Sequence, residues 1–137
     1  MSEKLSYLEQ VATFYDHAQT ATGEEYPGWH IYSMTEGTPE QVLQYFPEFQ
    51  LPAVVFCTEK MNFGNNPPVE FGFSVMICVD AAEEDAEEKL CKYRTRIGEF
   101  LLAQAVMNPG LQPESAQAIS FDPMIRAEVM HYTLRGY

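Results

Sequence analysis

The sequence is short of basic side chains. It has eight Lys and Arg residues against 20 Asp and Glu residues, which gives a formal charge of −12 at pH 7 over 137 residues. A surface that neutralises the phosphates of DNA, RNA or anionic lipid needs an excess of positive charge. The composition therefore argues against specific nucleic-acid binding and against a membrane-surface role. Four of the basic residues lie between Lys89 and Arg96, where we expect them to pair with acidic residues along one helix.

Cysteine is also scarce, with Cys57, Cys78 and Cys91 as the three examples. They form no C-x-x-C pair, and an odd number does not suit a framework of disulfides. The three histidines are scattered and none lies in an H-x-x-x-H spacing. We therefore expect buried thiols in a reducing compartment, with no metal and no cofactor.

Long apolar runs are missing. No segment has the character of a signal peptide or the length of a transmembrane helix. We expect a protein that is made in a cytosol and stays there unless it leaves as part of a particle.

Catalytic signatures are missing as well. The sequence has no G-x-S-x-G, no Cys beside a local base and no glycine-rich phosphate loop. The prediction is a protein that is not an enzyme, although a triad assembled from distant positions would leave no local signature.

The clearest pattern present is a strand followed by a long helix. Phe71 to Val79 alternates between a strongly apolar side and a smaller, more polar side, which is the period of a strand. Asp80-Ala81-Ala82-Glu83 has the form of a capping box and predicts that a helix begins there and runs to about Met107. Its apolar positions recur every three or four residues and should pack on the strand: Ala86, Leu90, Tyr93, Ile97 and Leu101.

Other segments complete the predicted domain. They are a helix over Glu3–Gln19 stopped by Gly23, a short strand over Trp29–Met34, a capped helix over Thr38–Phe46, a strand over Pro52–Lys60, a hairpin tip over Met61–Pro68, a polar connection over Gln112–Gln117, a short strand over Ala118–Phe121 and a final strand over Met124–Leu134. This order predicts a single α+β domain over residues 1–137, with residues 24–50 as an insertion. The sheet should be antiparallel or mixed, with about four strands and with helices packed mainly on one face.

This order of elements resembles the tail terminator, or tail-completion, proteins of tailed bacteriophages and prophages. The likeness is carried by the first helix, by Pro52–Phe56, by the Asn- and Pro-rich hairpin tip, by Phe71–Val79, by the acidic-then-basic helix from Asp80 to Leu102 and by Arg126–Arg135. The segment Tyr26–Phe49 departs from the smallest members of that family.

The resemblance implies a structural role. Such proteins form a ring, commonly six-membered, that terminates the tail tube and joins it to the head. The implied partners are further copies of the chain, the tail tube and head-completion proteins, and the implied location is the bacterial host cytosol and then the virion tail. A charge of −12 per protomer would suit a lumen that passes DNA without binding it.

Within this interpretation the hairpin tip is the candidate interface, with Met61 and Phe63 as apolar anchors beside Asn65. The alternative for that loop is a hairpin with no partner. Two other functions stay open for the whole chain. One is a cytosolic α+β protein that binds a small molecule, or has an unrecognised hydrolytic activity, around Trp29, His30 and Tyr32. The other is a stand-alone dimeric adaptor.

Overall fold

The computed structural model describes residues 7–63, 69–104 and 111–135 and forms one open sheet with the strand order β1-β2-β3-β5-β4. The elements are α1 (Tyr7–Glu25), β1 (His30–Met34), the 3₁₀ turn η1 (Pro39–Gln41), α2 (Val42–Tyr45), β2 (Ala53–Phe63), β3 (Val69–Asp80), α3 (Ala86–Gln104), β4 (Leu111–Ile119) and β5 (Ile125–Arg135). β1 is parallel to β2, and the other neighbouring pairs are antiparallel. The α+β class is confirmed, and the sheet is mixed, one of the two forms expected; it has five strands where about four were expected.

β3 lies at the centre of the sheet, between β2 and β5. The strand expected over Phe71–Val79 and its hairpin with the preceding strand are therefore confirmed. The side chains of Phe73, Val75 and Ile77 are fully buried on the side of the long helices, because successive residues of a strand point to opposite faces.

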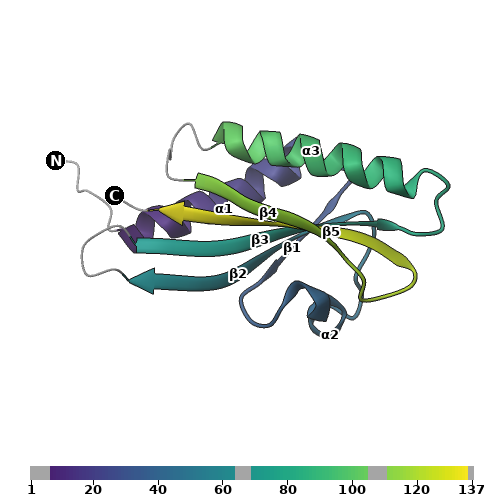
Figure 1. The fold of residues 1–137 in the computed structure, drawn as a ribbon, viewed down its shortest axis with the longest axis horizontal. Coiled ribbons are helices and arrows are strands. Elements are labelled where there is room, and N and C mark those ends of the chain that lie inside the picture. Colours follow the sequence, from purple (N-terminus) through teal and green to yellow (C-terminus); the bar gives the residue numbers. More distant parts are fainter. Residues whose placement is uncertain (1–6, 64–68, 105–110, 136–137) are drawn as a thin grey trace.

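The long helices α1 and α3 lie along one face of the sheet (Figure 1). α3 buries the stripe that its spacing predicts, with Ile97 and Leu101 fully inaccessible to solvent. Gly98 of this helix faces β5, where a Cβ would meet Met130 Sδ and the Tyr132 hydroxyl at the ordinary contact distance of 3.5 Å. The core on this face is therefore built mainly from α3, β3 and β5.

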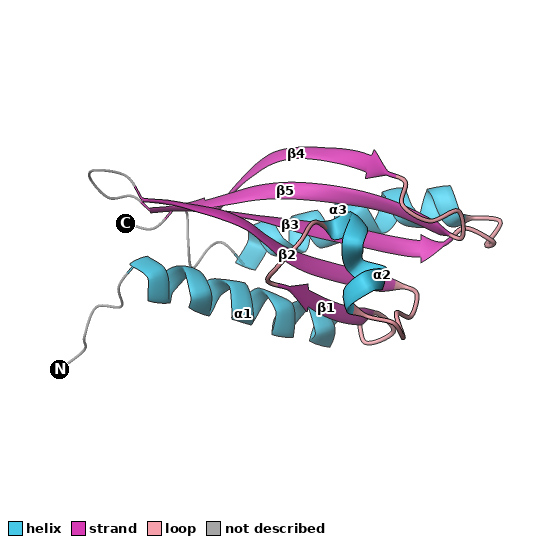
Figure 2. Cartoon of the chain, turned by 90° about the horizontal axis from the view of Figure 1, so that it is seen from below, coloured by secondary structure: helices cyan, strands magenta, loops and turns pink. Residues whose placement is uncertain are grey.

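The opposite face is covered by the segment that carries α2, which lies below the sheet in Figure 1 and in front of it in Figure 2. The residues of this second core include Met34, Val42, Val55, Met76 and Val129, with Phe46, Phe49 and Leu51 packed against them. Residues 24–50 therefore supply both the edge strand β1 and the cover of a sheet face.

Two helix boundaries differ from the prediction. α1 continues through Gly23 to Glu25, because its last turns pack over β1, and Gly in a helix costs only about 1 kcal/mol relative to Ala. α3 begins at Ala86 and not after Asp80. The Asp80 carboxylate accepts from the backbone N–H of Ala82 at 2.9 Å, which makes a turn in place of a helix cap.

The segment expected to be a polar connection is a strand. β4 spans Leu111–Ile119 and pairs with β5 along its length, with a register shift between Pro113 and Ser115. Its residues from Gln112 to Ala118 are all exposed, so no apolar alternation marked it as a strand. An edge strand needs little apolar surface, and an edge is also the place where a sheet tolerates Pro.

Candidate functional site

The hairpin of β2 and β3 extends beyond the strand at its side. β1 pairs with β2 only from Ala53 to Cys57, whereas β2 continues to Phe63. Within the described residues, no strand pairs with the outer side of residues 58–63, which we name the free edge of β2. Unpaired backbone N–H and C=O groups on a strand edge can pair with another chain.

Two of the three predicted interface residues lie on this free edge. Met61 and Phe63 are paired in register with Phe71 and Val69, so they belong to the strand and not to the tip where the sequence placed them. Asn65 lies outside the described residues. The sequence pattern predicted too short a strand, because Asn62 and the turn-forming residues after it interrupt the apolar alternation.

β1 ends where the chain turns toward α2. Gly37 has φ of +81°, a conformation that side chains other than hydrogen disfavour, and the backbone N–H of Thr38 donates to Gln41 Oε1 at 2.9 Å. The Thr58 hydroxyl donates to the carbonyl oxygen of Thr35 at 3.3 Å, beyond the last β1 pair. This bond fastens the start of the free edge to the turn.

The aromatic residues of the proposed ligand site do not come together. Trp29 packs on the α-helical face, with its ring centroid 4.7 Å from that of Tyr93, and Tyr26 packs there against the same Tyr93. Tyr32 lies on the other face with Phe46, and its hydroxyl accepts from the backbone N–H of Gln50 at 2.9 Å. Trp29 and Tyr32 therefore share no pocket.

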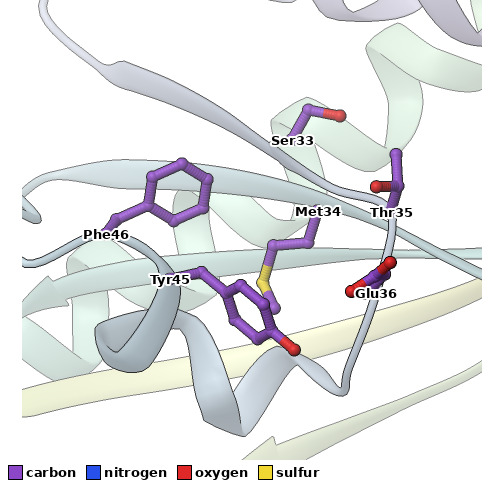
Figure 3. A pocket seen from close by; sticks show the side chains of 6 residues that line it. All are labelled: Ser33, Met34, Thr35, Glu36, Tyr45 and Phe46. Carbon is purple, nitrogen blue, oxygen red and sulfur yellow. The ribbon is translucent and has the colours of Figure 1, made fainter.

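A cavity of about 270 Å³ lies between the end of β1 and α2 (Figure 3). It is lined by Ser33, Met34, Thr35, Glu36, Tyr45 and Phe46, and we name it the α2 pocket. The pocket combines one carboxylate with two aromatic rings, which together suit a cationic group. Glu36 and Tyr45 were missed at the sequence level because only the turn at Gly37 places them on facing walls.

A second polar arrangement crosses the sheet. Glu59 Oε1 on β2 lies 2.5 Å from His131 Nδ1 on β5, although β3 lies between these strands. The register shift between Thr58 and Lys60 leaves Glu59 outside the regular pairing, and the nearby β3 residue is Gly72, which has no side chain to obstruct the contact. No sequence pattern predicts this pair, because its members are 72 residues apart.

Ser74 lies directly opposite His131 and Cys57 in the sheet register. Serine, histidine and a carboxylate are the residue types of a hydrolytic triad. The Ser74 side chain, however, is completely buried, and its hydroxyl makes no hydrogen bond of regular geometry within the described residues. A nucleophile must reach its substrate, so this arrangement does not form an active site as it stands.

The buried thiols are also poor nucleophiles. Burial raises the pKa of Cys57, and the charges of Glu59 and Glu40 raise it further, against an opposing effect of the Ser74 hydroxyl. Burial alone raises the pKa of Cys78. Both groups therefore remain thiols at neutral pH, as packed core residues do.

Within the part of the chain that the structure describes, no three His, Cys, Asp or Glu residues are grouped so as to hold a metal ion. None of the described helices is both long enough and apolar enough to cross a membrane. No sequence model of a known protein family matches the chain, and none of the curated proteins matches its sequence.

Proposed function

We propose that this protein is a structural component of a phage or prophage tail, which forms a ring that terminates the tail tube and joins it to the head. The proposal starts from the resemblance in element order described above. It is supported by a structure whose distinctive surfaces are a strand edge and an exposed aromatic pocket, features that suit binding to other chains.

The free edge of β2 is the single observation that carries the proposal. The pairing of β2 with β1 ends at Cys57, and six further residues of β2 continue to Phe63. The outer backbone groups of these six residues face away from the sheet. A strand from a neighbouring copy or from the tube can add to this edge, with backbone hydrogen bonds giving affinity and alternate side chains giving specificity. Met61 and Phe63 lie on it at alternate positions.

Charge gives a secondary argument. A ring of protomers that each carry −12 presents a strongly acidic surface, and an acidic lumen repels the phosphates of DNA in transit. The same charge makes the protomers repel one another. Screening by salt should therefore promote assembly, since the Debye length falls from about 30 Å at 0.01 M to about 8 Å at 0.15 M salt.

The test is the solution mass by light scattering, over a series of concentrations and salt concentrations, combined with negative-stain electron microscopy. Ring-shaped particles of one size support the proposal. Met61→Glu and Phe63→Glu should reduce assembly, because each places a charge in the contact. Leu102→Glu is the matched control, since Leu102 is a comparably apolar residue on the exposed side of α3.

A protein that stays monomeric at every salt and protein concentration would contradict self-assembly into a ring. Rings that form equally well in the Met61→Glu and Phe63→Glu variants would support the ring but show that the free edge is not one of its contacts.

A further inference from the structure

The α2 pocket lies in the most uniformly acidic part of the chain. From Leu5 to Glu59 the sequence contains no Lys and no Arg, and its acidic residues there are Glu9, Asp16, Glu24, Glu25, Glu36, Glu40, Glu48 and Glu59. No Lys or Arg within this part of the sequence can therefore pair with Glu36. A cation that enters the pocket has to come from elsewhere.

The Tyr45 ring is the accessible wall of the pocket. Tyr45 lies on the four-residue helix α2, lines the pocket and is 47% exposed, so a group from another chain can reach its ring. The pocket therefore combines a carboxylate and aromatic rings on one short segment.

The basic residues of the chain are concentrated on α3, and most of them already have partners. Lys89 Nζ lies 3.1 Å from Glu83, Arg94 Nε lies 3.1 Å from Glu128, and Lys92 Nζ lies 5.7 Å from the centre of the Tyr93 ring. Arg96 is exposed and has no carboxylate within 4.0 Å among the described residues. The pairing expected at spacings of three or four along the helix is therefore not seen among the described residues, where the partners Glu83 and Glu128 lie outside α3.

We propose that the α2 pocket binds the Arg96 side chain of a second copy of this chain. The planar guanidinium can stack on the Tyr45 or Phe46 ring while it donates hydrogen bonds to the Glu36 carboxylate. The pocket and Arg96 lie on different surfaces, so the contact is head-to-tail. Repeated head-to-tail contacts close into a ring when the rotation between successive copies allows it. The inference rests on the ring proposed above and names one of its contacts.

The test exchanges the two charges. Glu36→Arg and Arg96→Glu should each weaken self-association at least about tenfold, because each places like charges in contact. An equimolar mixture of the two variants should restore it to within about threefold of the wild type, since every contact between unlike copies then pairs opposite charges. The measurement is sedimentation velocity at about 0.15 M salt, where net repulsion is screened and a partly enclosed pair persists.

Lys92→Glu and Glu48→Arg are the matched controls, because they make the same charge changes on the same segments outside the contact. Circular dichroism and thermal unfolding show whether each variant folds, and Glu36→Gln and Arg96→Gln replace any that does not. These neutral variants should weaken association by a smaller factor.

The proposal is overturned if the wild type remains monomeric, if either exchanged variant associates as tightly as the wild type, or if the mixture restores nothing. Rings in both exchanged variants would be consistent with the tail function but would show that the α2 pocket does not bind Arg96. Restoration by the mixture in assemblies that are not rings would keep the contact and contradict the tail function.

Discussion

Glu59 and His131 meet across a strand to which neither belongs. Their carboxylate and imidazole groups contact each other over β3, and the side chains of His131 and Glu59 are 29% and 35% exposed. The contact links β2 directly to β5 and spans the middle of the sheet at the base of the free edge. It is therefore a constraint on the hairpin that backbone pairing alone does not supply.

We expect Glu59→Gln and His131→Gln to be coupled. The free energy of unfolding from urea titrations of both single variants and the double variant should give a coupling energy of about 0.5 kcal/mol, the scale for partly exposed ion pairs. Additive effects within about 0.3 kcal/mol would mean that the contact adds nothing to stability.

Gly37→Ala should destabilise the fold by about 1–2 kcal/mol. The residue has φ of +81°, and a Cβ there would lie 2.5 Å from Gln41 Oε1, the acceptor that holds Thr38. Chemical denaturation measures the loss. Gly28→Ala is the control, because a Cβ at Gly28 meets nothing within 4 Å, and equal effects of the two changes would contradict the explanation.

A thiol reagent should modify only one cysteine of the folded protein. Cys91 is exposed, whereas Cys57 and Cys78 are buried and have raised pKa values. Titration with a chromogenic disulfide should therefore release one equivalent at once, and the other two only after unfolding. Fast reaction of the Cys91→Ser variant would show that a sheet thiol is accessible.

Alkaline pH should weaken the fold through Tyr132. Burial raises the pKa of this phenol to about 12 from 10.0. The folded state then retains a proton that the unfolded state loses. Stability is complete below pH 10 and falls as the pH rises from 10 to 12, by about 1 kcal/mol from this group at pH 11. Tyr132→Phe should show a smaller decrease between pH 8 and pH 11 in the measured unfolding free energy.

The sequence predicted best those elements that bury a repeating apolar face. Phe71–Val79 and the stripe from Ala86 to Leu101 appear in the structure as expected, because burial of such faces dominates their energetics. The first helix ran past its expected stop because packing on β1 outweighs the modest cost of Gly23.

Elements held by backbone pairing alone were not predictable in the same way. β4 carries little apolar signal between Leu111 and Ile119, and the exposed residues between them are held by backbone pairing with β5. The candidate sites show the same limit. Glu36 approaches Tyr45 through one turn, and Glu59 approaches His131 through one bulge, and neither approach has a sequence spacing of its own.

The two edges of the sheet differ in how readily another strand can pair with them. On one side, Pro113 removes a backbone donor from β4 and the register shift beside it bends the strand, while the opposite side presents the free edge of β2. Stacking of identical sheets into a fibre requires two edges that accept each other without limit. Within the described residues, Pro113 and the register shift make the β4 side less receptive than the free edge of β2, so we expect growth of concentrated solutions into amyloid-like filaments to be disfavoured.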